Sequence, residues 1–301
     1  MKTVFISGIN GFIGTQCARV FLKDGYSVVG AGRDEAATLE GVGYHQCDVR
    51  DLRCVQSASR GGDIFIHLAA VTEHHAIVND PITTLLINWE GTKTALDSFI
   101  ENKGKHFIFS STGKVYGEYG EKDLPLTEEI PPRPLSILGK SKYIAERLID
   151  YYARIYPDRI FTILRVFNVY GAGQKETFLV PTILKQVKGG KTIIELKDVD
   201  AQRDYVHIDD VVNAIKLVAE KNTKQGASVF NVSTNTPTSA KRIVEITGEL
   251  VGKKIVVKGD LAQKRPDELD VEYASNHKLM ALGWVPSFGI SDGLQKLLEN
   301  Q

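Results

Sequence analysis

Thr112 and Lys142 carry side chains that could take part in moving a proton. Thr112 closes a run of hydroxyl residues that begins at Ser110, and Lys142 lies in a later segment with a helical pattern. A hydroxyl can orient a substrate alcohol, and a lysine can lower the pKa of a neighbouring acid, so both suit general acid–base chemistry. Leu138, one helical turn before Lys142, has no ionisable group. Proton transfer here therefore needs a different side chain, or does not occur.

Segment 138–142, taken with Thr112, resembles the hydroxyl and Tyr-x-x-x-Lys constellation of the extended short-chain dehydrogenase/reductases, with Leu138 in place of the tyrosine. In that family the tyrosinate takes a proton from a sugar hydroxyl while a hydride leaves to a nicotinamide. The lysine lowers the phenol pKa and binds ribose, and the serine or threonine orients the hydroxyl. The resemblance implies catalytic roles for Thr112 and Lys142. Loss of a positioned acid–base group costs roughly 10²–10⁴ in rate.

Lys114 is one candidate for the missing acid–base group. It follows Thr112 by two residues, and in an extended segment residues two apart share a face. A lysine whose neutral form is favoured by desolvation can act as a general base. Some UDP-N-acetylglucosamine 4,6-dehydratases resemble the chain in having lysine at this position, although Gly113 stands where they carry aspartate. A solvated loop lysine is the alternative.

Three further candidates lie in one loop. Glu73, His74 and His75 follow the turn at Ala69 and Ala70, and in the family this loop faces the nicotinamide. Histidine is the side chain that titrates nearest to neutral pH, so either histidine could replace the phenol. Adjacent histidines that are simply exposed to solvent are the alternative.

The run from Gly8 to Gly14 predicts a dinucleotide site. It follows a short apolar strand pattern and opens a helical one. Glycines allow a tight turn there and let backbone N–H groups approach a pyrophosphate at the positive end of the helix. We expect the cofactor to contact Gly8, Gly11, Phe12, Ile13 and Gly14.

The family resemblance implies more cofactor contacts in the first half of the chain. It places an acid against adenine at the end of the third strand, and backbone along the cofactor at the end of the fourth. The residues that it implies are Asp48, Val49, Leu68, Ala69, Ala70, Asn88 and Lys142.

The end of the second predicted strand bears on the choice of cofactor. Members that prefer NAD place an acid there, which accepts hydrogen bonds from the ribose hydroxyls, but this chain has Arg33 before Asp34. Arginine can bind the 2′-phosphate of NADP. We therefore predict NADP, with NAD bound through Asp34 as the alternative and a solvated Arg33 as a third possibility.

Motifs in the second half resemble the nucleotide-sugar epimerase and dehydratase branch of the family. They lie in segments 164–171, 202–211, 265–267 and 282–286. That branch holds the diphosphate of its substrate with an asparagine and two later arginines, which implies substrate-binding roles for Asn168, Arg203 and Arg265. The planar fork of arginine donates bidentate, charge-assisted bonds to phosphate. Surface salt bridges are the alternative use of the two arginines.

These side chains need a scaffold that brings distant segments to one edge. The first half alternates short β-branched or aromatic runs with amphipathic segments, which predicts an α/β fold with a Rossmann-type doubly wound parallel sheet. We expect this sheet in residues 1–170. Residues 171–301 should form a smaller C-terminal substrate-binding domain, with segments that return to the first. The expected strands are 3–7, 27–30, 44–47, 64–68, 107–110 and 161–165, and the expected helices are 12–23, one near Val55, 82–101, 138–155, 180–188, 209–221, 240–250 and 289–298.

Composition limits the classes of partner. The 37 basic and 37 acidic residues cancel, so no overall field would attract nucleic acid or an anionic membrane, and no apolar stretch reaches the ~20 residues that span a bilayer. Cys17, Cys47 and Cys54 have no metal-ligand spacing, and we expect inert buried thiols, a reducing cytoplasmic location and no metal. The family resemblance implies a homodimer that packs helices 82–101 and 138–155.

The sequence thus predicts NAD(P)-dependent modification of a nucleotide-diphosphate sugar by hydride transfer at C4, with an atypical acid–base group. Epimerase, 4,6-dehydratase and 4-ketoreductase reactions remain open, as do the sugar and the base. The rival interpretation is a cofactor- or nucleotide-sugar-binding protein that has lost catalysis and serves as a regulator or partner subunit. Retention of Thr112, Lys142, Arg203 and Arg265 favours the enzyme.

Overall fold

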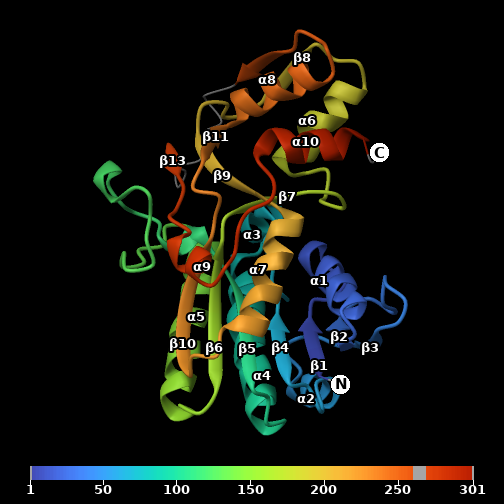
Figure 1. The fold of residues 1–301 in the computed structure, drawn as a ribbon, viewed down its shortest axis with the longest axis vertical. Coiled ribbons are helices and arrows are strands. Elements are labelled where there is room, and N and C mark those ends of the chain that lie inside the picture. Colours follow the sequence, from blue (N-terminus) through green and yellow to red (C-terminus); the bar gives the residue numbers. More distant parts are fainter. Residues whose placement is uncertain (1, 260–268, 300–301) are drawn as a thin grey trace.

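A seven-stranded parallel sheet forms the larger part of the molecule in the computed structural model, which describes residues 2–259 and 269–299 (Figure 1). The spatial order is β10-β6-β5-β4-β1-β2-β3, and every neighbouring pair runs parallel. The order reverses between β1 and β4, which confirms the predicted doubly wound sheet. The strands are β1 (Thr3–Ser7), β2 (Ser27–Gly32), β3 (Gly43–Gln46), β4 (Ile64–His67), β5 (His106–Thr112), β6 (Ile160–Val166) and β10 (Gly226–Val232).

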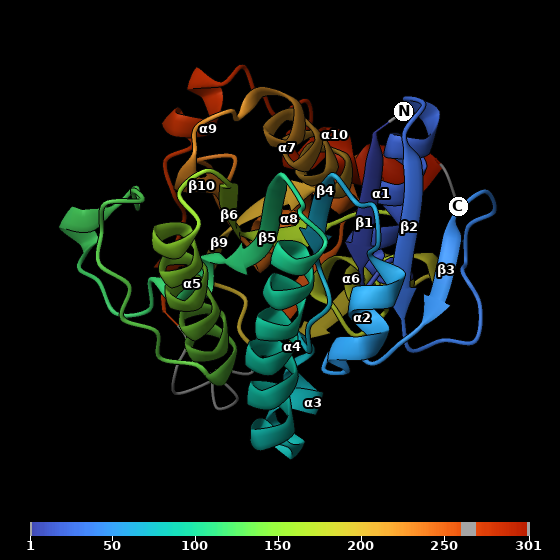
Figure 2. The ribbon, with the colours of Figure 1, turned by 90° about the horizontal axis from the view of Figure 1, so that it is seen from below.

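Helices cover both faces of this sheet (Figure 2). One face carries α1 (Phe12–Lys23) and α7 (Ile208–Lys221), which pack on each other, and the other carries α2 (Leu52–Ala58), α4 (Pro81–Glu101) and α5 (Ile137–Ile155). Each face of the sheet has its own apolar core. Within β1, Val4 and Ile6 pack in the core under α1 and α7, while Phe5 packs in the core under α2, α4 and α5. Strands that are buried on both faces are formed by continuous apolar runs, and such runs allowed the strands to be predicted from the sequence.

Short polar signals begin the two long helices. Asp80 accepts a hydrogen bond from the Thr83 N–H and is followed by proline at the first helical position of α4. Ser136 accepts from the Gly139 N–H and begins α5. Both are standard N-terminal caps, so the helices that carry the site residues have locally defined starts.

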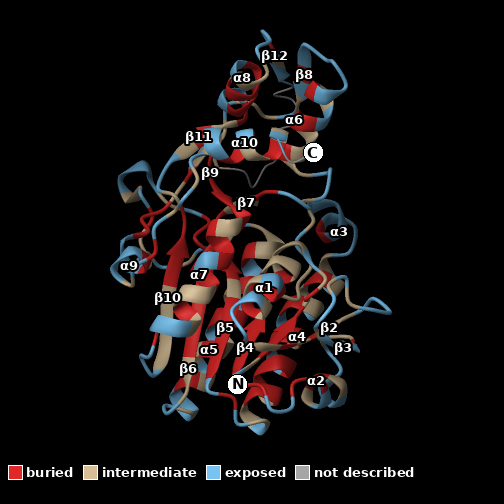
Figure 3. Cartoon of the chain, turned by 45° about the vertical axis from the view of Figure 1, so that its right-hand side comes forward, coloured by how far each residue is buried: buried red, intermediate tan, exposed pale blue. Residues whose placement is uncertain are grey.

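The second half of the chain contributes both to the main sheet and to a smaller part above it in Figure 1. Strand β10 and helix α7 join the main sheet, so the chain returns to it after residue 171. The rest packs around a third apolar core (Figure 3). The smaller part contains β7 (Asn168–Tyr170), α6 (Leu179–Lys188), β8 (Ile193–Leu196), β9 (Gln202–His207), β11 (Pro237–Ser239), α8 (Ala240–Leu250), β12 (Val256–Gly259), β13 (Val271–Glu272) and α10 (Ile290–Glu299). Helix α9 (His277–Ala281) instead packs beside β10 of the main sheet.

Among the described residues, four short helical elements were not expected from the sequence, one of which is α9. Helix α3 (His74–Asn79) forms where a loop was predicted, and single turns of 3₁₀ helix occupy η1 (Gly113–Val115) and η2 (Glu121–Asp123). Each is too short for a periodic hydrophobic pattern to show in the sequence. Within the two described ranges, no helix combines the length and apolar character needed to cross a membrane.

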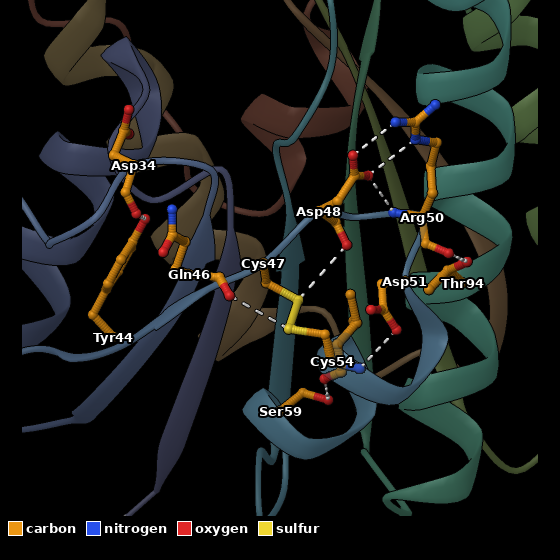
Figure 4. The surroundings of a disulfide bond; sticks show 11 residues. Asp34, Tyr44, Gln46, Cys47, Asp48, Arg50, Asp51, Cys54, Ser59 and Thr94 are labelled. Atoms are coloured by element: carbon orange, nitrogen blue, oxygen red, sulfur yellow. Dashed lines mark hydrogen bonds and ion pairs between the residues drawn. A yellow bond between two sulfur atoms is a disulfide. The ribbon is translucent and has the colours of Figure 1, made fainter.

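The interpretation of the cysteines as three inert thiols was wrong for two of them. Cys47 follows β3 and Cys54 lies in the first turn of α2, and the structure joins them as a disulfide (Figure 4). Cys17 is free and buried. The disulfide ties the end of β3 to α2 on either side of the loop that contains Asp48. The pair could not be predicted from sequence spacing, because the two cysteines are seven residues apart and meet only through the turn between β3 and α2.

Candidate functional site

The glycine turn after β1 leaves no space for side chains. Gly8 has φ +72°, and a Cβ on it would lie 2.8 Å from the Ala69 nitrogen. A Cβ on Gly14 would lie 2.2 Å from the Gly8 carbonyl oxygen. Gly11 precedes α1 and caps it without a side chain, so the first N–H groups of the helix, on Phe12 and Ile13, face outward from a bare turn. This geometry fits a pyrophosphate at the helix N-terminus.

A buried series of hydrogen-bonded side chains holds the end of β4 against this turn. The ring of His67 bonds the Ser7 hydroxyl at Nδ1 (2.7 Å) and the Thr92 hydroxyl at Nε2 (3.1 Å). Burial lowers the pKa of His67 to about 3, so the ring is neutral. The Ser7 hydroxyl also accepts from the Ala69 N–H (3.3 Å). Leu68 and Ala69 therefore lie beside Gly8, with Ala70 next in the chain. The contribution of Ser7 had no signal in the sequence.

Asn88 has a structural role in this arrangement. Its side-chain oxygen accepts from the Val71 N–H (2.7 Å), and its NH₂ donates to the Val71 carbonyl (3.1 Å) and to the Ser141 hydroxyl (3.0 Å). It thus joins the loop after β4 to helix α5. All of these bonds lie within the protein, so Asn88 would influence a cofactor by holding Val71 and α5 in place.

Charged side chains gather beyond β2 and β3. The Asp48 carboxylate accepts three hydrogen bonds from Arg50, one from its backbone and two from its guanidinium, which lower the pKa of Asp48 to about 2 (Figure 4). Asp34 accepts from the Asn10 side chain (2.9 Å), so the acid is anchored to the glycine turn. Arg33 is exposed beside it. Val49 fills the space beside Gly91, where a Cβ would lie 2.6 Å from it.

Lys142 is buried in α5 next to the end of β5. Its ammonium donates to the Ser110 carbonyl (2.7 Å) and lies 4.6 Å from the centre of the Phe109 ring. Burial lowers the pKa of Lys142 to about 7, against the opposing influence of Glu146. Glu146 in turn accepts from the Ser111 hydroxyl (2.5 Å) and from Nε and Nη2 of the Arg165 guanidinium.

The first turn of α5 lies against the 3₁₀ turn that follows β5. A Cβ on Gly139 would lie 2.4 Å from the Lys114 carbonyl oxygen. The Thr112 hydroxyl accepts from the Lys114 N–H (3.3 Å). The turn thus brings Thr112 and Lys114 to the end of α5 that carries Leu138, which is partly buried there.

Lys114 is part of an ion cluster that sequence reasoning missed. Its ammonium lies 2.5 Å from the Glu272 carboxylate on β13, and the Arg203 Nε on β9 lies 3.7 Å from the same oxygen. Glu272 is 3% exposed and Arg203 5% exposed. The Tyr119 hydroxyl donates to the Val271 carbonyl (2.6 Å). Glu272 had no signal in the sequence, since a single acid far along the chain resembles any surface carboxylate.

The remaining predicted residues occupy separate positions. Glu73 forms an ion pair with Lys175, while His74 and His75 are exposed in the first turn of α3. Asn168 begins β7, which pairs with β9 near Arg203. Arg265 lies outside the described residues. In the part of the chain that is described, no three His, Cys, Asp or Glu side chains gather as a metal site would require.

We expect the buried Lys142 to make stability depend on pH. Burial holds its pKa at about 7 in the folded state, below the ordinary lysine value of 10.5, so between these values the unfolded chain binds more protons and stability rises with pH. The slope due to Lys142 should approach about 1.4 kcal/mol per pH unit, measured as the free energy of unfolding in urea without cofactor. Lys142→Met should remove this slope.

The exposed Lys122→Met is the matched control and should keep the wild-type dependence. Identical slopes in wild type and Lys142→Met would contradict a lysine neutralised by burial.

Comparisons with known proteins agree with this geometry. The model of the "NAD dependent epimerase/dehydratase family" matches residues 4–233. A UDP-glucose 4-epimerase of Halalkalibacterium halodurans is 27% identical over 95% of this chain and 91% of its own. The structure of the Thermotoga maritima UDP-glucose 4-epimerase with UDP-glucose has a TM-score of 0.89 at 27% identity, covering 99% and 97% of the two chains. The structure of RMD from Pseudomonas aeruginosa complexed with NADPH has a TM-score of 0.84 at 25% identity, covering 99% and 98%.

Proposed function

The chain belongs to the NAD-dependent epimerase/dehydratase family, and we propose that it modifies a nucleotide-diphosphate sugar by hydride transfer at C4 of the sugar. The observation that carries this proposal is the grouping of Thr112, Lys114 and Lys142 where β5 meets α5. The carboxyl ends of the parallel strands form one edge, so this group shares its edge with the bare glycine turn. A nicotinamide bound there would accept the hydride from C4 and return it.

Among the three reactions that the sequence leaves open, we favour 4-epimerisation. The similar proteins named above that state a reaction are UDP-glucose 4-epimerases. Gly113 stands where the dehydratases resembling this chain carry aspartate, which argues against elimination of water. We propose Arg203, Asn168 and Arg265 as ligands of the diphosphate, and Arg203 lies beside Glu272.

Lys114 is the acid–base group in this proposal. Leu138 cannot transfer a proton, and Lys114 is the ionisable side chain whose backbone is bonded to the Thr112 hydroxyl. Thr112 would orient the C4 hydroxyl, and the Lys114 amine would take its proton. The retained Lys142 then has the role of holding ribose rather than tuning a phenol.

We propose NADP as the cofactor, with NAD as the alternative. Asp34 is occupied by the Asn10 side chain, whereas Arg33 beside it is exposed and available to a 2′-phosphate. Among similar structures, one was determined with NADPH and others with NAD, and the family description names NAD.

Arg33→Ala should weaken NADPH binding about tenfold and leave NADH binding unchanged, since only NADPH carries the extra phosphate. Calorimetric titration of both dinucleotides measures this, with the exposed Arg60→Ala as control. Equal affinities of the two cofactors, untouched by the substitution, would remove Arg33 from the site.

The chemical proposal predicts conversion of at least one member of a panel of UDP-, GDP- and dTDP-sugars, followed by product NMR in single turnover. The converted sugar should also raise the melting temperature, because it binds only the folded state. Lys114→Met should lower the chemical step roughly 10²–10⁴-fold. Leu138→Tyr should not increase the rate of an enzyme whose base is Lys114.

A different outcome would support the rival function. Leu138 favours a protein that binds but does not convert its ligand. In that case wild type would be stabilised by a nucleotide-sugar without converting it, and Leu138→Tyr would restore some conversion beside Thr112 and Lys142. Absence of both stabilisation and conversion across the panel would refute the nucleotide-sugar class.

We also propose a homodimer formed through α4 and α5, which pack side by side. Both helices expose large apolar side chains, including Ile82 (67%) and Trp89 (37%) on α4 and Ile144 (40%) and Tyr151 (58%) on α5. Neighbouring apolar side chains of this size commonly mark an interface.

Light scattering should show a dimer at micromolar concentration, and Ile82→Asp with Tyr151→Asp should convert it to a monomer because two charges would be buried in the interface. Val285→Asp, equally exposed but outside these helices, is the control. A wild-type monomer would contradict the interface.

A further inference from the structure

Glu272 is a carboxylate that the fold buries beside the proposed catalytic lysine. It lies on the short strand β13 and is 3% exposed. A buried carboxylate is costly unless cations or hydrogen-bond donors compensate it. Its partners here are the Lys114 ammonium at 2.5 Å and the Arg203 guanidinium at 3.7 Å. The closer contact is therefore with the side chain that is proposed to take the substrate proton.

The ion pair spans from the protein interior to the cleft. The Lys114 side chain is 34% exposed while that of Glu272 is 4% exposed. Both line a small cleft with Gly117, Leu135, Ser136 and Leu269. Lys114 is therefore the more accessible of the two groups to a ligand, while Glu272 lies beside it and is almost wholly buried.

The other polar groups around the ion pair do not compete with Lys114 for proton exchange with Glu272. Arg203, from β9, stays positively charged and holds the second position next to the carboxylate. Burial, and then the charge of Glu272, raise the pKa of Tyr119, so its phenol stays protonated and donates to the Val271 carbonyl. Among the described residues packed here, Lys114 is the group that can both lose and regain a proton next to Glu272.

We propose that Glu272 and Lys114 form a two-step proton relay in which Glu272 is the final acceptor. This rests on the proposed function. The Lys114 ammonium passes one proton to the Glu272 carboxylate, and the resulting amine takes the proton of the C4 hydroxyl as its O–H bond breaks. The C4–H bond breaks at the same time, its electron pair leaves as hydride to the oxidised nicotinamide dinucleotide, and a C4 carbonyl forms. Return of the hydride reverses each proton transfer.

The relay explains both the burial of Glu272 beside Lys114 and the absence of an ionisable group at Leu138. A lysine held as a permanent ammonium could not accept a proton, and the buried carboxylate provides a place for the proton that it must lose first. It also replaces a function that Leu138 cannot perform. The competing explanation is an ion pair that only fastens β13 to the 3₁₀ turn after β5.

Lys114→Arg tests whether the side chain at this position must give up a proton. Arginine can keep the ion pair with Glu272 but stays protonated at any accessible pH, so it cannot pass a proton on. We expect single-turnover conversion to fall at least roughly 10²-fold, with substrate affinity within about threefold of wild type. Conversion close to wild type in this variant would overturn the relay together with Lys114 as the acid–base group. A pair that only fastens β13 is separated from the relay by Glu272→Gln, which a merely structural pair predicts to convert substrate at close to the wild-type rate.

Glu272→Gln removes the acceptor at nearly constant shape. We expect a comparable loss of rate, an altered pH–rate profile and partial recovery in Glu272→Asp. Glu128→Gln is the matched control, since Glu128 is also a buried carboxylate, accepts from the Asn231 N–H (2.8 Å) and lies outside the proposed machinery. The control should convert substrate within about twofold of wild type.

The double variant Lys114→Met with Glu272→Gln should be no slower than Lys114→Met alone. Two members of one relay act as a unit, so once Lys114 is removed the loss of Glu272 has no further effect on the rate. Independent losses that multiply would overturn the relay, as would full activity of Glu272→Gln. Failure of the proposed function is distinguishable, because wild type itself would then convert no sugar, and the relay would fall with it.

Discussion

The buried ion pair between Glu146 and Arg165 is the interaction on which the geometry of the site depends. It joins α5 to β6, and the Ser111 hydroxyl of β5 donates to the same carboxylate. Both charged side chains are about 5% exposed, and loss of one partner of such a pair typically costs about 3–5 kcal/mol. The pair sets where α5 lies on the sheet. It thereby sets where Lys142 meets the Ser110 carbonyl and where the first turn of α5 meets Thr112.

The site retains most parts of a proton-transfer apparatus around a position that cannot transfer a proton. Leu138 occupies the turn of α5 that faces the Thr112–Lys114 segment, and Lys142 is still buried one turn later. The structure adds Glu272 from the far end of the chain, at the side of Lys114. Compared with the Tyr-x-x-x-Lys arrangement, this site lacks the phenol at position 138. It has instead a lysine, Lys114, paired with a buried carboxylate, Glu272, next to Thr112.

Agreement between predicted and observed elements follows from how local each signal was. Helices α1 and α8 begin and end at the predicted residues, because an amphipathic period and their first residues define them locally: the glycine turn precedes α1, and Ser239 caps α8. The six strands of the first half differ from prediction by at most a few residues, since each is a buried apolar run. Helix α3 was missed because its six residues give too short a pattern. The pairing of Cys47 with Cys54 was missed because it depends on the turn between β3 and α2.

The sequence by itself determined the sheet, the glycine turn and the absence of a phenol at position 138, because each is a property of contiguous residues. The candidate roles of Thr112, Lys114 and Lys142 could likewise be inferred from short spacings. Only the tertiary structure decided that Glu272 stands beside Lys114, although 158 positions separate them in the chain. Spatial proximity at such separations arises here from the pairing of β13 with β9 and of β9 with β7, in a sheet separate from the main one. No local pattern of residue types encodes that pairing, so the charge of the site became visible only in the folded chain.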